Sequence, residues 1–292
     1  MIHILVLITL LVWGIAGVFD KKAVAASTNQ TVFLLFHLFN FVLLSGLLVI
    51  SFFTAMHWSF STQMWLWSSL GAGGGVLAML LYYSALSRTD ASYVLGITAA
   101  YPVISSLLAA PILGEALSLP KLASATLVSL GVGLIGTTAS ASQQKLSARD
   151  LRIVLFCVLG AALSWGGVGV FEKKAVSYGN ALEGYFAETA WELVFAGIAW
   201  LIFKKQGLKF DFSNARIWRF AWLSALCVAV GNYCILQLMK TQSASYAIVI
   251  TACYPLVLYI CALVFLKEKL SKMRLVGIVL VILGGILTEL IH

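Results

Sequence analysis

The sequence predicts an all-α integral membrane protein with ten transmembrane helices, arranged as two inverted repeats of five helices each. Three observations predict this fold: an apolar composition, a series of long apolar segments, and an internal repeat. Hydrophobic residues make up 61% of the 292 residues and charged residues only 10%, whereas a soluble domain carries about 25% charged residues. A bilayer suits such a chain, because each spanning helix needs about 20 apolar residues.

Ten apolar segments follow one another along the chain, joined by short polar connections that leave no room for a soluble domain. Each segment is long enough to cross a bilayer as a helix. The expected spans are 3–25, 31–54, 64–87, 91–112, 119–138, 151–175, 182–203, 216–239, 243–265 and 272–290.

The second half of the chain repeats the first. Residues 13–24 read WGIAGVFDKKAV and residues 165–176 read WGGVGVFEKKAV. The pattern Thr-x-x-Tyr-Pro at 98–102 returns at 251–255, and the offset stays at 152 to 153 throughout. A constant register over this length indicates a duplication. We therefore expect a first repeat over 1–140, a linker over 141–150 and a second repeat over 151–292.

An odd number of spans in each copy means that the second copy enters the membrane from the opposite side. The two copies are therefore predicted to be inverted about an axis in the membrane plane. Inverted repeats are typical of secondary carriers, whose halves move around a site at their interface.

These features resemble the EamA family of the drug/metabolite transporter superfamily, over essentially the whole chain. The matching residues are Trp-Gly in the first span of each copy, Tyr-Pro in the fourth, Gly114-Glu115 and Lys267-Glu268 before the fifth, and glycines in the fifth (Gly131, Gly133 and Gly136 against Gly277, Gly284 and Gly285). The resemblance implies transport without specifying a substrate, since members move amino acids, drugs, nucleotide-sugar-like metabolites and other solutes.

Two acidic residues of the seventh span are the strongest local signal for a site. Glu188 and Glu192 are four residues apart, so they share one helix face, and acidic residues at this depth usually face a cavity or a partner. They are predicted to bind a proton or a substrate amine; packing against a neighbouring helix is the alternative. The corresponding turn of the second span carries His37 and Asn40, which are polar but not acidic.

The paired prolines mark a second candidate site. Pro102 and Pro255 break their helices and release the carbonyls of Thr98 and Thr251 from hydrogen bonds. Matched breaks in two halves indicate a midplane binding site, to which Tyr101 and Tyr254 would add rings and hydroxyls. Kinks that serve packing alone are the alternative.

Trp13 and Trp165 recur deep in the first span of each copy, and they could stack on an organic cation or pack against the glycine that follows each of them. The motifs Asp20-Lys21-Lys22 and Glu172-Lys173-Lys174 are interpreted as span ends with local ion pairing. A role as a gate is the alternative for these motifs.

Other functional classes find little support in the sequence. We expect no enzyme, no catalytic residues, no cofactor and no metal site, because no nucleophile, zinc or nucleotide motif stands in a suitable context. The net charge of +8 fits residues flanking a membrane better than nucleic-acid binding.

The predicted function is alternating-access transport of a small organic metabolite, with amines or amphipathic cations favoured and proton coupling plausible. The expected partners are this solute, the lipid bilayer and a second copy in a homodimer. The expected location is the cytoplasmic membrane of a bacterium, with both termini on one side. The charge count places them outside, whereas family habit places them inside. A flippase for lipid-linked substrates and a membrane scaffold or sensor are the alternatives.

Overall fold

The computed structural model describes residues 1–51, 53, 58–59, 61–89, 91–139, 147–257, 259 and 272–291, without the side chains of 91–93, 95 and 136–139. The described helices are α1 (Ile2–Ala26), α2 (Asn29–Ser51), α3 (Thr62–Leu86), α4 (Ala91–Thr98), α5 (Tyr101–Leu113), α6 (Leu119–Ala139), α7 (Ala148–Val176), α8 (Ala181–Lys205), α9 (Ala215–Thr241), α10 (Ala244–Thr251) and α12 (Lys272–Leu290).

The described part of the chain contains eight helices long and apolar enough to cross a membrane, and two shorter apolar segments, Leu119–Ile135 and Ala244–Val257. Large apolar side chains cover their outer faces; Leu7, Phe156 and Leu201 are examples of exposed ones. Such a surface requires lipid around it, because lipid tails are as apolar as these side chains. The protein is therefore an integral membrane protein, as the composition predicted.

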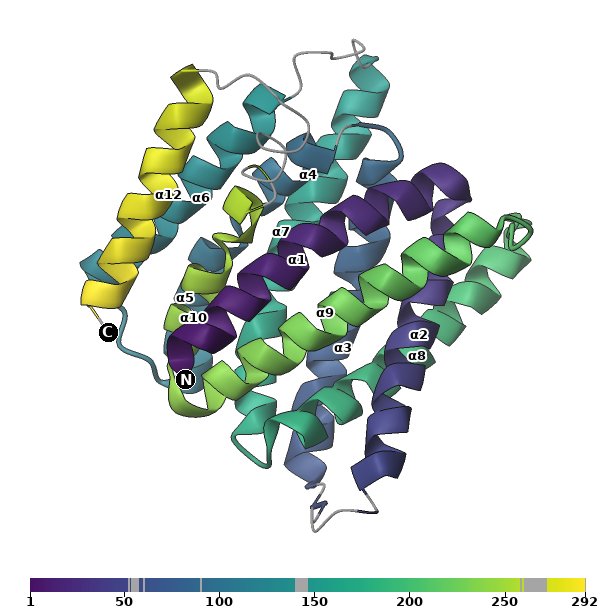
Figure 1. The fold of residues 1–292 in the computed structure, drawn as a ribbon, viewed down its shortest axis with the longest axis horizontal. Helices are drawn as coiled ribbons and strands as arrows, with labels where there is room; N and C mark the ends of the chain where they lie inside the picture. Colours follow the sequence, from purple (N-terminus) through teal and green to yellow (C-terminus); the bar gives the residue numbers. More distant parts are fainter. Residues whose placement is uncertain are drawn as a thin grey trace.

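Helices of each half pack mainly against helices of the other half. The first helix of each half lies along the third helix of the other half, so that α1 packs on α9 and α7 packs on α3. Figure 1 shows α1 and α9 running side by side across the front of the molecule. The second helices, α2 and α8, also contact each other. The interface between the halves is therefore the centre of the protein.

The last helices of the two halves, α6 and α12, pack together at one edge (Figure 1). Glycines allow this approach, because a Cβ atom at Gly131 would lie 2.6 Å from the carbonyl oxygen of Gly277. Close backbone contact at small residues is a common way for membrane helices to associate. The glycine-rich faces of these two spans are thus used within one chain.

The fourth span, expected over 91–112, is divided into two helices at the break that Pro102 predicts. Helix α4 ends at Thr98 and α5 begins at Tyr101, directly before Pro102. Proline cannot donate the backbone hydrogen bond that would continue α4. The second half repeats this break, since α10 ends at Thr251 and helical structure resumes at Tyr254. The remainder of the predicted span 243–265 lies largely outside the described residues.

Candidate functional site

A cavity of about 190 Å³ lies between the two halves. Its walls come from both halves, and nearly every lining residue has a counterpart 152 or 153 positions away that also lines the cavity. The pairs are Trp13/Trp165, Ala16/Val168, Gly17/Gly169, Asp20/Glu172, Phe36/Glu188, Asn40/Glu192, Gly75/Val228, Met79/Asn232, Tyr82/Ile235 and Tyr101/Tyr254. The cavity therefore spans the axis that relates the two repeats.

Glu188 and Glu192 of α8 both line this cavity. Two glycines of α3 make room for them: a Cβ atom at Gly71 would lie 3.2 Å from Glu188 Oε1, and one at Gly75 would lie 3.1 Å from Glu192 Oε1. The glycines have the same spacing of four residues as the glutamates. The glycines of α3 therefore leave space for the two carboxyl groups, and they also allow neighbouring helices to pack closely.

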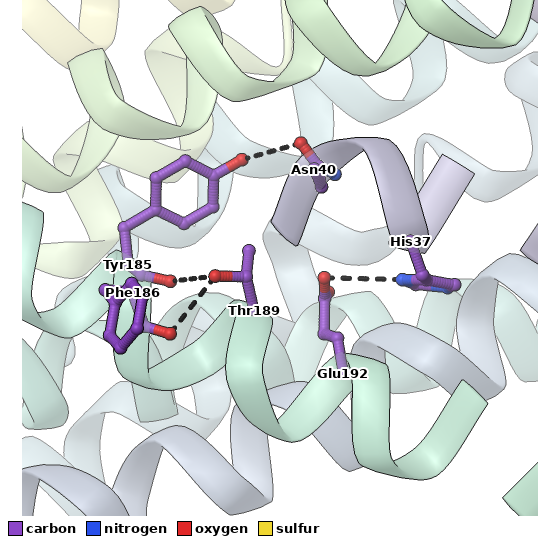
Figure 2. A network of polar contacts seen from close by, with 6 residues as sticks. All are labelled: His37, Asn40, Tyr185, Phe186, Thr189 and Glu192. Atoms are coloured by element: carbon purple, nitrogen blue, oxygen red, sulfur yellow. Dashed lines mark hydrogen bonds and ion pairs between the residues drawn. The ribbon is translucent and has the colours of Figure 1, made fainter. Parts of the chain in front are cut away.

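His37 and Asn40 of α2 contact α8 at this level, as Figure 2 shows. His37 Nδ1 lies 3.4 Å from Glu192 Oε2, and the Tyr185 hydroxyl donates to Asn40 Oδ1 at 3.3 Å. His37 is buried behind the cavity between the rings of Phe33 and Phe36. Asn40 lines the cavity directly. In the strict register of the repeat the counterpart of Glu188 is Phe36, and not His37.

Asp20 and Glu172 also line the cavity, which the interpretation as ion-paired span ends missed. Asp20 Oδ1 accepts hydrogen bonds from the hydroxyls of Ser224 (2.7 Å) and Tyr83 (3.3 Å). The carboxyl group of Glu172 lies near that of Glu188, close enough for the two to interact electrostatically. One signal could have found both acids: Asp20 follows Trp13 by seven residues, as Glu172 follows Trp165, and that spacing places each pair on one helix face.

The first lysine of each motif binds outside the cavity, at the C-terminal end of a helix. Lys21 Nζ donates to the carbonyls of Leu86 and Thr89, both at 3.2 Å. Lys173 Nζ donates to the carbonyls of Met239 and Gln242. These are equivalent positions in the two halves, where a cation complements the exposed carbonyls of a helix end. The acids of the two motifs are therefore not neutralised by the lysine that follows each of them.

The recurring aromatic residues form much of the cavity wall. Trp13 contacts Tyr254 edge to face with ring centroids 5.7 Å apart, and its indole N–H donates to Asn232 Oδ1 at 3.2 Å. Trp165 contacts Tyr82 at 5.5 Å. Tyr101 also lines the cavity. Aromatic faces attract cations when they are desolvated, so this wall suits a positively charged ligand.

Thr98 and Thr251 lie at the helix breaks but outside the cavity lining. Both are buried, and their hydroxyls donate within their own helices, to the carbonyls of Val94 (3.0 Å) and Ala247 (2.6 Å). Pro102 and Pro255 shape the breaks from which Tyr101 and Tyr254 extend toward the cavity. The tyrosine of each break therefore lines the cavity, whereas the threonine does not.

The fold is that of a membrane protein whose two related halves enclose a cavity, an arrangement typical of transporters. A model of the EamA-like transporter family matches residues 1–137 and again residues 152–290. The chain belongs to the EamA-like transporter family.

Two further comparisons found similar proteins whose names state no function. An uncharacterized protein of Methanocaldococcus jannaschii is 27% identical over 124 residues, which are 42% of this chain and 88% of the relative. That relative is therefore about as long as one repeat. A solved crystal structure is similar to 99% of this chain and 96% of its own, with a TM-score of 0.77 and 15% identity. At that identity the likeness concerns the fold alone.

Proposed function

We propose that the protein is a secondary carrier for a small organic cation, which binds in the cavity between the halves and crosses by alternating access. One observation carries this proposal. Asp20, Glu172, Glu188 and Glu192 all line the cavity, and its lining within the described chain includes no Lys or Arg. Buried carboxylates without a cationic partner are costly, so a cationic solute would supply the missing charge.

The size of the cavity favours a small solute over the alternative of a lipid-linked one. Drug-sized ligands occupy pockets of roughly 300–1,000 Å³, whereas this cavity measures about 190 Å³. A scaffold that binds no solute is disfavoured for another reason, because such a protein gains nothing from four acids around an internal cavity.

Proton exchange would follow from the way these acids contact each other. The carboxyl groups of Glu172 and Glu188 are neighbours, and two ionised carboxylates this close repel each other, so a proton on one of them relieves the repulsion. Entry of a cation beside this pair would favour release of that proton. The titratable groups around it are Asp20, His37, Tyr82, Tyr101, Tyr185, Glu192 and Tyr254.

The experiment uses purified protein in liposomes that contain a pH-sensitive dye. Phenyltrimethylammonium is a suitable probe, because its permanent charge prevents it from crossing lipid as a neutral base. Adding it outside should drive protons out of liposomes that contain the protein. Glu188→Gln should reduce this signal at least tenfold, whereas Glu289→Gln, which alters a carboxyl group outside the cavity, should leave it unchanged. No proton movement and no probe uptake with the intact protein would refute the proposed function.

For the orientation we propose that both termini face the outside of the cytoplasmic membrane of a bacterium. Lys121, Lys173, Lys174 and Lys240 share the side of the termini, which leaves fifteen of the nineteen Lys and Arg residues on the opposite side. Positively charged residues accumulate on the cytoplasmic side. A C-terminal alkaline phosphatase fusion should therefore be active in cells and a C-terminal green fluorescent protein fusion should be dark. The reverse pair of results would place the termini inside.

A further inference from the structure

The acids of the cavity form two separate groups, one from each half of the chain. The first acidic pole is Asp20 on α1, which contacts Tyr83 and Ser224. The second acidic pole consists of Glu172 on α7 with Glu188 and Glu192 on α8. Because Asp20 and Glu172 are counterparts in the repeat, the poles lie across the axis that relates the halves.

Each pole offers carboxyl groups with which no Lys or Arg of the described chain forms an ion pair. The basic side chain beside the second pole is His37, whose Nδ1 lies 3.4 Å from Glu192 Oε2. At the first pole, the hydroxyl groups of Ser224 and Tyr83 donate to the carboxyl group of Asp20. Lys21 binds backbone carbonyls and Lys22 lies over the ring of Phe220. At the second pole, one proton between Glu172 and Glu188 would leave a single negative charge on that pair. The cavity therefore offers carboxyl groups to a cation at two separate places.

A metal ion would not match this arrangement. Calcium and magnesium need about six oxygen ligands around one point, and within the described residues no three His, Cys, Asp or Glu side chains are grouped closely enough to hold a metal ion. Between the poles the wall is aromatic, with Trp13 and Trp165 from equivalent positions. Rings there suit the alkyl chain and the flanks of an organic cation.

We infer that the ligand of the cavity is a linear organic dication, a diamine in its diammonium form, with one ammonium group at each acidic pole. This inference rests on the proposed function and adds the charge and shape of the solute. A site built from two related halves accepts a molecule whose two ends are alike. The second pole, with three carboxyl groups, would hold its ammonium group more tightly than the first.

The test is calorimetric titration of the detergent-solubilised protein with 1,4-diaminobutane and with n-butylamine, which differ in one terminal charge. The diamine should bind at least tenfold more tightly, the equivalent of about 1.4 kcal/mol. Asp20→Asn keeps the hydrogen-bond acceptor for Ser224 and Tyr83, and it should remove most of this preference, because the first pole then offers no carboxylate to the second ammonium group. Glu289→Gln is the control and should preserve the preference.

A second measurement needs no variant. In a series from 1,2-diaminoethane to 1,8-diaminooctane the affinity should pass through a maximum, because the separation of the poles is fixed. Equal binding of mono- and diamines, or affinity that rises steadily with chain length, would overturn the dication while leaving a monocation carrier intact. Absence of binding by every amine would instead count against the proposed function.

Discussion

Gly71 and Gly75 illustrate how single residues set up the cavity. Each occupies a position of α3 where a side chain would meet a carboxyl oxygen of α8, at 3.2 Å and 3.1 Å respectively. Nearly all real Cβ contacts are longer than this, so a larger residue would displace the glutamate. The position of a charge in the cavity thus depends on a residue that has no side chain.

Gly75→Ala should therefore weaken cation binding by roughly 3- to 10-fold, which corresponds to about 1 kcal/mol, because it shifts Glu192 without removing it. Gly73→Ala is the matched control in the same helix, since its Cβ would make an ordinary contact of 3.7 Å with the Phe195 ring. Titration with phenyltrimethylammonium would compare the two variants. Equal affinities would show that the space beside Glu192 at Gly75 does not affect binding.

At this scale the sequence identified some of the residues around the cavity and missed others. The spacing of Glu188 and Glu192 and the recurrence of Trp13 and Trp165 are visible without a structure. Asp20 and Glu172 escaped because the lysines that follow suggested a solvated span end. Each of these acids is followed by a lysine that binds carbonyls at the end of a distant helix. Local sequence spacing carries no information about such a long-range contact.

At the scale of elements, the close packing of α6 against α12 depends on glycines at the points of contact. A Cβ at Gly277 would lie 2.7 Å from the Gly131 carbonyl oxygen, and one at Gly284 would lie 2.9 Å from the Val128 backbone nitrogen. Backbone atoms cannot move aside as a flexible side chain can. The two helices would therefore have to separate to admit any larger residue.

Gly277→Ala should lower the free energy of unfolding by about 1–3 kcal/mol, as other overpacked sites do. Gly197→Ala in α8 is the control, because nothing lies within 4 Å of its Cβ position. Thermal denaturation in detergent would give the difference between the two variants. A transition in Gly277→Ala that matches the control would indicate that the α6–α12 contact contributes little to stability.

The broken helices show what the sequence could and could not predict about elements. Pro102 and Pro255 correctly located the breaks, because the missing donor acts on the nearest turn. Whether a kinked helix or two separate helices, α4 and α5, would form there could not be predicted from the prolines alone. The continuity of a helix after a proline depends on packing around the break, which hydropathy does not report.

For the whole molecule, the duplication predicted the helical architecture and the inversion of the halves. The register of 152 to 153 residues is a property of the sequence alone. The exchange of partners, with α1 on α9 and α7 on α3, could not be predicted from that register. Equivalent helices in two copies can pack within a copy or between copies, and both arrangements have the same repeat.

Because the halves share their core, a fragment containing residues 1–140 should fail to fold alone and should be degraded or aggregate in cells. Co-expression with a fragment of residues 147–292 should restore a complex, since each fragment supplies helices that the other lacks. Affinity purification through a tag on one fragment would recover both. A stable, monodisperse first half without its partner would contradict the shared core.

The pairing of α1 with α9 also has a consequence for biosynthesis. The ribosome releases α1 first, yet its main packing partner is completed only when residue 241 has been made. Until then Asp20 lacks the hydroxyl of Ser224 that it later binds. During most of translation, α1 must therefore stay in the bilayer with its polar Asp20 side chain and without its main packing partner. Substitutions near Asp20 would then affect the yield of inserted protein before they affect transport.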